Sequence, residues 1–172
     1  RYGVMLREDG IVMDDGTTTR ISENHYHMTT TTAQAANVLS HLEYYLQLVW
    51  PELNVNVVST TEQWAGAAIA GPNSRALLMK LFPNTDVSNE GLPFMGYKEA
   101  DLFGIPAKIY RISFSGELAY EVNVESDFGN FMWEKIIEVG KEFQIQPNGT
   151  EALSTLRIEM GHVAGSELDG RT

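Results

Sequence analysis

Polar and apolar residues alternate along the first thirty positions, the pattern of half-buried β-strands. Residues 3–6 and 11–14 flank the turn-like stretch 7–10, which ends in glycine, and we expect them to form a hairpin. Asp15-Gly16 is typical of a second turn. The remaining β-rich runs of this region are residues 17–21 and 25–30.

Positions 32–49 have the clearest helical period of the chain. Apolar residues recur three and four positions apart and so share one helix face: Ala35, Leu39, Leu42, Leu46 and Val49. Thr32 is a candidate cap for the start, and Pro51 ends the helix just after this stretch.

The rest of the chain alternates strands with helices. We expect strands at 53–57, 64–70, 97–103, 106–114 and 119–124, and helices at 74–81, 127–140 and 150–160. Residues 64–70 are small and apolar, which favours a strand packed on both faces. Asp127 and Thr150 are the expected caps of the last two helices. This order predicts an α+β fold of mostly antiparallel sheets with flanking helices, with a possible break between two lobes near 60–63.

Composition narrows the class of protein. The 172 residues are 43% hydrophobic, enough for one domain or two small lobes with a sizeable core. Twelve basic against 23 acidic residues give a net charge of −11, which argues against nucleic acid or an anionic membrane as a partner. The absence of cysteine excludes disulfides and thiol catalysis. With no transmembrane run and no signal peptide in view, we expect a cytoplasmic protein.

The chain begins at Arg1 without an initiator methionine, directly in a strand-like run. We therefore expect it to be a segment of a longer polypeptide.

Two neighbouring carboxylates close the second strand. Asp15 precedes a glycine and is explained by turn chemistry, whereas Asp14 ends an apolar strand. Taken alone, the pattern favours a solvated strand end for Asp14 and leaves a functional role open.

The last helix carries two charges at the border of its apolar face. Arg157 lies four residues after Leu153, and Glu159 three after Leu156. The pair indicates either an ion-paired or ligand-binding role, or an amphipathic rim with extended apolar stems.

His25 and His27 share one strand face, a spacing that can hold a metal ion. A tetrahedral site needs further ligands, and the chain has no cysteine to supply them. We therefore expect no metal here.

Four sequence blocks resemble the glycine-cleavage T-protein (aminomethyltransferase) family. They occur in the family's order and span nearly the whole chain: residues 2–15, 70–74, 115–121 and 156–161. Residues 1–10, 62–65 and 149–165 further resemble the C-terminal region of heterotetrameric sarcosine oxidase alpha subunits. Where T-proteins carry an ARD triplet, this chain has Ala152-Leu153-Ser154, so we do not expect it to accept an aminomethyl group from a lipoyl carrier protein.

This resemblance implies a partial aminomethyltransferase-like domain over 1–172 that binds tetrahydrofolate. It implies that the one-carbon unit from sarcosine is captured as 5,10-methylenetetrahydrofolate, with FAD, FMN and NAD bound elsewhere in a hetero-oligomeric oxidase. The alternatives are the aminomethyltransferase of the glycine cleavage system and a non-catalytic domain for subunit assembly.

The resemblance also implies roles for single residues. Asp14 takes the position of an essential aspartate, and its substitution should leave folding nearly unaffected if it faces a cavity. Tyr2 is expected to stack on folate, and Glu159 to accept hydrogen bonds from the pterin edge. The remaining expected folate-binding residues are Glu117, Tyr120 and Arg157, the last as a partner of Glu159 or of another nearby carboxylate. We expect Asp14 and Glu159 to line one pocket.

Overall fold

The computed structural model describes residues 1–164 and residue 167. Gly165, the last residue of one matched block, lies outside the described residues. The chain divides into two compact units. The first unit contains Arg1–Thr61 with the described residues from Val163 on, and the second unit contains Glu62–His162. Each unit combines helices with an antiparallel sheet, which confirms the expected α+β class.

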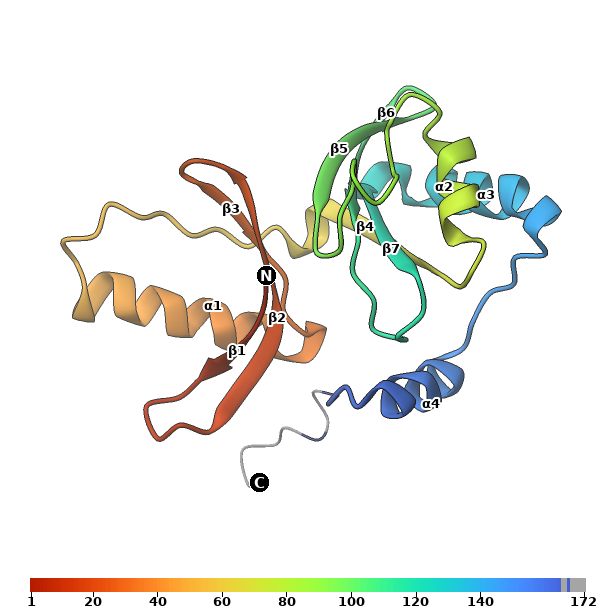
Figure 1. Cartoon of the computed structure of the whole chain (residues 1–172). Helices are drawn as coiled ribbons and strands as arrows, with labels where there is room; N and C mark the ends of the chain where they lie inside the picture. The colour runs from red at the N-terminus through yellow and green to blue at the C-terminus, as the bar shows by residue number, and fades with distance from the viewer. Residues whose placement is uncertain (165–166, 168–172) are drawn as a thin grey trace. The chain divides into compact units, whose positions relative to one another are not determined.

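The first unit is built on a three-stranded antiparallel sheet (Figure 1). Its strands are β1 (Tyr2–Leu6), β2 (Val12–Ser22) and β3 (His25–Met28), in the order β1-β2-β3. The expected turn at Asp15-Gly16 is wrong, because β2 runs through both residues and Gly16 pairs with Gly3. A Cβ on Gly16 would lie 1.9 Å from the carbonyl oxygen of Thr29. Glycine is needed here for close approach of two backbones rather than for a turn.

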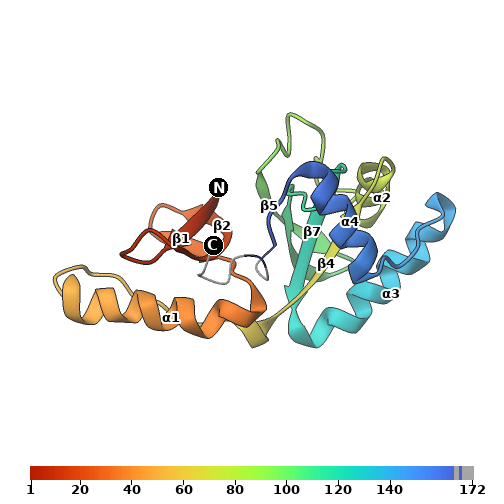
Figure 2. The same ribbon diagram turned by 90° about the horizontal axis from the view of Figure 1, so that it is seen from below.

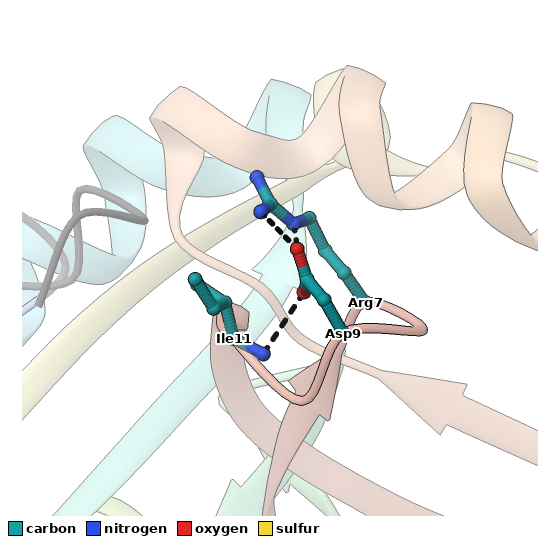
Figure 3. A network of polar contacts seen from close by, with 3 residues as sticks. All are labelled: Arg7, Asp9 and Ile11. Carbon is teal, nitrogen blue, oxygen red and sulfur yellow. Dashed lines mark hydrogen bonds and ion pairs between the residues drawn. The ribbon is translucent and has the colours of Figure 1, made fainter.

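The turn between β1 and β2 is stabilised by one carboxylate (Figure 3). Asp9 accepts hydrogen bonds from the backbone N–H of Ile11, at 3.1 Å, and from the guanidinium of Arg7. Gly10 has a φ of 82°, a left-handed conformation that glycine adopts without strain. The expected hairpin is therefore confirmed.

The expected helix at 32–49 forms as three consecutive segments. The 3₁₀ turn η1 (Thr32–Gln34) leads into α1 (Ala35–Tyr44), which continues as the π-helical segment η2 (Tyr45–Val49). Thr31, not Thr32, occupies the N-cap position of η1. The strand expected at 53–57 is wrong, since this stretch has no regular structure and its residues are exposed. Alternation produces a strand only where a neighbouring strand supplies hydrogen-bond partners.

A four-stranded antiparallel sheet forms the centre of the second unit. Its strands are β4 (Trp64–Ala70), β5 (Tyr97–Leu102), β6 (Ile105–Tyr110) and β7 (Ala119–Glu125), in the order β4-β7-β6-β5. The expectation that β4 packs on both faces is wrong, because Ile69 is buried while Gly66, Ala68 and Ala70 are exposed.

Helices α2 (Ser74–Leu81) and α3 (Gly129–Gly140) contact each other and the strand β7, and α3 also contacts β4 (Figures 1 and 2). Helix α4 (Thr150–Met160) and two 3₁₀ turns, η4 (Ser126–Phe128) and η5 (Lys141–Phe143), complete the unit. A further 3₁₀ turn, η3 (Thr61–Gln63), includes the residues on both sides of the boundary between the units along the chain. The N-cap residues of α3 and α4 are Phe128 and Gly149, so the expected caps Asp127 and Thr150 are wrong.

Buried apolar residues are concentrated in the second unit. The core combines side chains from both helices and the sheet: Leu77, Leu78, Leu81, Ile109, Tyr120, Val122, Val124, Met132 and Ile136. Among the described residues of the first unit, Val38 alone is a buried hydrophobic residue. The described helices include none with the length and apolarity that crossing a membrane requires.

Candidate functional site

Asp14 is buried in the first unit, with 1% of its surface exposed. Its two carboxylate oxygens accept hydrogen bonds from one residue, Thr31: Oδ2 from the backbone N–H and Oδ1 from the side-chain hydroxyl, both at 2.9 Å. Because Thr31 precedes η1, the strand residue Asp14 caps the start of the helical segment. These two hydrogen bonds satisfy the buried carboxylate within this unit, and its facing a cavity stays a prediction.

Asp15 points to the opposite face of β2 from Asp14, as alternation along a strand requires. Its Oδ2 accepts a hydrogen bond of 2.7 Å from the hydroxyl of Tyr2 on β1. This hydrogen bond, with partial burial, raises the pKa of Tyr2 to about 12. Tyr2 is 56% exposed and Asp15 is half-buried. We call these two residues the Tyr2–Asp15 pair, which presents an aromatic ring beside an accessible carboxylate.

A second polar surface lies on one face of the sheet in the second unit. Register places Tyr97, Tyr110 and Glu121 in one row across β5, β6 and β7. The rings of Tyr97 and Tyr110 are 5.1 Å apart, and burial raises the pKa of Tyr110 to about 12. Burial also raises the pKa of the Glu121 carboxyl. We call this row the Glu121 face.

Sequence reasoning missed both Asp15 and Glu121 as site residues. The signal for Glu121 was present in β7, where Tyr120 and Val122 are buried and the residue between them must point to the other face. Asp15 was missed because its neighbour Gly16 was interpreted as part of a turn.

Two expected folate-binding residues of the second unit, Tyr120 and Glu117, differ in their exposure to solvent. Tyr120 has no exposed surface, and its hydroxyl accepts a hydrogen bond of 2.8 Å from Arg75 Nε, so within this unit it belongs to the core. Glu117 is exposed in the turn before β7.

Arg157 and Glu159 also differ in exposure. Arg157 is buried at 8% exposure and donates a hydrogen bond of 3.0 Å to the carbonyl oxygen of His162, beyond the end of α4. Glu159 is exposed on the same helix. Asp14 belongs to the first unit and Glu159 to the second, so their joining in one pocket stays a prediction.

His25 and His27 lie on β3. The residues that the structure describes contain no group of three or more histidine or acidic side chains arranged to hold a metal ion. The expectation that these histidines bind no metal stays a prediction.

All 172 residues match the family described as the GCVT N-terminal domain, so the chain belongs to this family. Among its relatives, it is 51% identical over 172 residues to the sarcosine oxidase subunit alpha of Rhizobium meliloti (strain 1021). This match covers 99% of the chain and 17% of that subunit. It is 49% identical to the same subunit of Corynebacterium sp. (strain P-1), covering 18% of it. The expected resemblance is thereby confirmed.

Aminomethyltransferases are more distant relatives. The enzyme of Chloroherpeton thalassium (strain ATCC 35110 / GB-78) is 31% identical over 173 residues, a match that covers 46% of its length. The crystal structure of glycine cleavage system aminomethyltransferase T from Bartonella henselae shares the fold, with a TM-score of 0.78 at 22% identity. That similarity covers the whole of this chain and 44% of the other. The chain thus spans less than half of each of these relatives.

Proposed function

We propose that this chain is the folate-binding region of a sarcosine oxidase alpha subunit. In this role it captures the one-carbon unit of sarcosine on tetrahydrofolate as 5,10-methylenetetrahydrofolate. The observation that carries the proposal is the 51% identity, along 99% of the chain, to an alpha subunit of that enzyme. We assign the oxidation of sarcosine to FAD, FMN and NAD, bound elsewhere in the full enzyme. The full enzyme also contains further subunits.

The Tyr2–Asp15 pair fits an acceptor that carries an aromatic ring next to an amine. The exposed ring of Tyr2 offers a stacking surface, and the carboxylate of Asp15 lies at its hydroxyl. Tetrahydrofolate, when bound, supplies the amine nitrogens that take up the one-carbon unit. A fixed carboxylate beside such a nitrogen stabilises positive charge that develops during the transfer.

We assign different roles to the two adjacent aspartates, Asp14 and Asp15. Both oxygens of Asp14 are occupied by Thr31, whereas Asp15 keeps accessible surface. We therefore assign contact with the reacting amine to Asp15. Asp14, the expected catalytic residue, holds β2 against the start of the helical segment and so positions Asp15.

Recognition of the pterin edge needs a second carboxylate. A carboxylate forms stronger charge-assisted hydrogen bonds where water is excluded. Glu121 is half-buried, and burial raises the pKa of its carboxyl, while Glu159 is exposed. We assign the pterin contact to Glu121 first and keep Glu159 as the alternative.

The catalytic assignment is tested in the full-length enzyme by a paired assay. Oxygen uptake with sarcosine reports oxidation, and 5,10-methylenetetrahydrofolate formation reports capture. Asp15→Asn should slow capture by roughly 10²–10³ while oxidation continues at the parent rate. Asp14→Asn should slow capture through misplacement of Asp15. Capture at the parent rate in Asp15→Asn would overturn the assignment, and loss of oxidation would overturn the separation of the two steps.

The pterin contact is tested by binding. Glu121→Gln should weaken tetrahydrofolate about tenfold or more, since one charge-assisted acceptor is lost. Glu159→Gln is the matched comparison and should have little effect. The opposite result would assign the contact to Glu159. A folate complex of the full enzyme would also show directly whether Asp14 and Glu159 line one pocket.

A further inference from the structure

Two arginines of the second unit converge on a single uncharged oxygen. Oδ1 of Asn89 accepts a hydrogen bond from Arg75 Nη2 at 2.7 Å and another from Arg111 Nη1 at 2.9 Å. Arg75 lies in the first turn of α2, and Arg111 directly follows β6. The two guanidinium groups are therefore close neighbours although 36 positions separate them in the sequence.

The other contacts of these arginines are also to neutral oxygens. Arg75 Nε donates to the hydroxyl of Tyr120 at 2.8 Å, and Arg111 Nη1 donates to the carbonyl of Leu92 at 3.1 Å. Within the described part of the chain, neither arginine forms a salt bridge. Two like charges at this separation repel, and an amide oxygen carries no net charge to offset them.

A cavity of about 320 Å³ opens beside Arg75 and Asn89, and Arg111 adjoins it through its hydrogen bond to Asn89 without lining it. Thr85 and Ser88 also line the cavity. Each guanidinium presents a planar set of five N–H donors, of which the contacts above occupy only part. These spare guanidinium donors match the geometry of carboxylate and phosphate groups.

Two acidic residues also line the cavity, Asp86 and Glu90. Hydrogen bonds from the side chain and backbone of Ser88, with the nearby charge of Lys98, hold the pKa of Asp86 below its usual value. The charge of Lys98 is the smallest of these influences, so the carboxylate of Asp86 also opposes an anion at this cavity. Glu90 is exposed, and its charge opposes the binding of an anion at this cavity.

We propose that Arg75 and Arg111 form a binding site for a small oxyanion, a carboxylate or a phosphate group, at the cavity beside Asn89. The bound oxyanion bridges the two guanidinium groups and supplies the negative charge that Asn89 lacks. The site is formed entirely within the second unit, and the proposal does not depend on folate binding or on sarcosine oxidation.

The test uses the intact full-length protein and calorimetric titration. Inorganic phosphate and succinate are titrated separately, with sodium chloride at matched ionic strength as the reference. We expect saturable binding of phosphate, of succinate or of both, and binding of only one identifies the class of oxyanion. Failure of both to bind a folded protein would overturn the proposal.

Three variants locate the binding. Arg111→Gln should weaken it about tenfold or more, because charge-assisted hydrogen bonds are lost. Glu90→Gln should strengthen it several-fold, since an opposing charge is removed. Lys141→Gln, which removes a positive charge outside the cavity wall, is the control and should leave binding unchanged. Thermal unfolding verifies that each variant is folded, and unchanged affinity in folded Arg111→Gln would overturn the site.

Discussion

At the scale of single residues, Asp14 and Asp15 show how neighbours in one strand acquire different chemistry. Asp14 is buried, with both oxygens bonded to Thr31, while Asp15 is half-buried beside the exposed ring of Tyr2. Alternation along β2 sends the two carboxylates to opposite faces. Structural and chemical roles can therefore be separated by substitution.

Asp14→Ala should lower the free energy of unfolding by about 2–4 kcal/mol, because the N–H and hydroxyl of Thr31 lose their buried acceptor. Asp15→Ala, which breaks a more exposed hydrogen bond, should cost under about 1 kcal/mol. Urea unfolding of the full-length protein measures both. Equal effects of the two substitutions would contradict the structural role of Asp14.

The Tyr2–Asp15 pair also predicts a pH dependence. The pKa of Tyr2 is raised from 10.0 to about 12, so the fold favours its protonated hydroxyl. The stability that this contributes is complete below pH 10 and is lost as the pH rises to about 12. Between about pH 9 and about pH 11, urea unfolding should therefore show a smaller loss of stability in Tyr2→Phe than in the parent.

Tyr26→Phe is the matched control, since Tyr26 is another exposed tyrosine of the same unit, on β3. It should lose stability with pH as the parent does. If Tyr2→Phe and the parent gave parallel curves, the bond between Tyr2 and Asp15 would not contribute in solution.

At the scale of elements, the three-stranded sheet depends on one glycine. Gly16 and Gly3 are partners across β1 and β2, yet only Gly16 lies against another backbone, that of Thr29. The side-chain space at the two positions therefore differs although the two residues are paired across the strands.

Gly16→Ala should destabilise the protein by roughly 1–3 kcal/mol, because the added methyl group has no space beside Thr29. Gly3→Ala, where a Cβ would meet nothing within 4 Å, is the control and should be close to neutral. Thermal unfolding of both variants measures the difference. A neutral Gly16→Ala would show that the backbone of Thr29 can move away from β2.

Helices and strands were predicted correctly where the local pattern of apolar and polar residues decided the structure. Helix α2 occupies the expected residues 74–81, and the hairpin of β1 and β2 forms with the expected turn. It failed at Gly16, where a tertiary neighbour and not turn chemistry explains the glycine. It also failed at 53–57, where the alternating pattern was present and no strand formed.

At the scale of the whole molecule, the two units differ in how much apolar surface they bury. The hydrophobic core lies in the second unit, and the first unit contributes only Val38 to the buried hydrophobic residues among those described. Apolar burial supplies most of the free energy of folding. The two units should therefore differ in their ability to fold alone.

A fragment of residues 62–162 should fold cooperatively by itself, whereas a fragment of residues 1–61 should not. Dispersed amide signals in NMR spectra and a sigmoidal urea transition are expected for the first and not for the second. A cooperative transition in the 1–61 fragment would show that its sheet and helical segment suffice without a larger core.

Periodicity determined the α+β class and most helices and strands, because it depends on the order of residues alone. The resemblance to the T-protein family rested separately on four sequence blocks. Tertiary structure decided which carboxylates are accessible. Both carboxylate oxygens of Asp14 accept hydrogen bonds from Thr31. Tyr120 is part of the core, and Glu121 is half-buried whereas Glu117 is exposed. Exposure and hydrogen-bond partners come from residues distant in sequence, so local patterns do not contain them. The meeting of Arg75 and Arg111 at Asn89 depends on tertiary structure for the same reason.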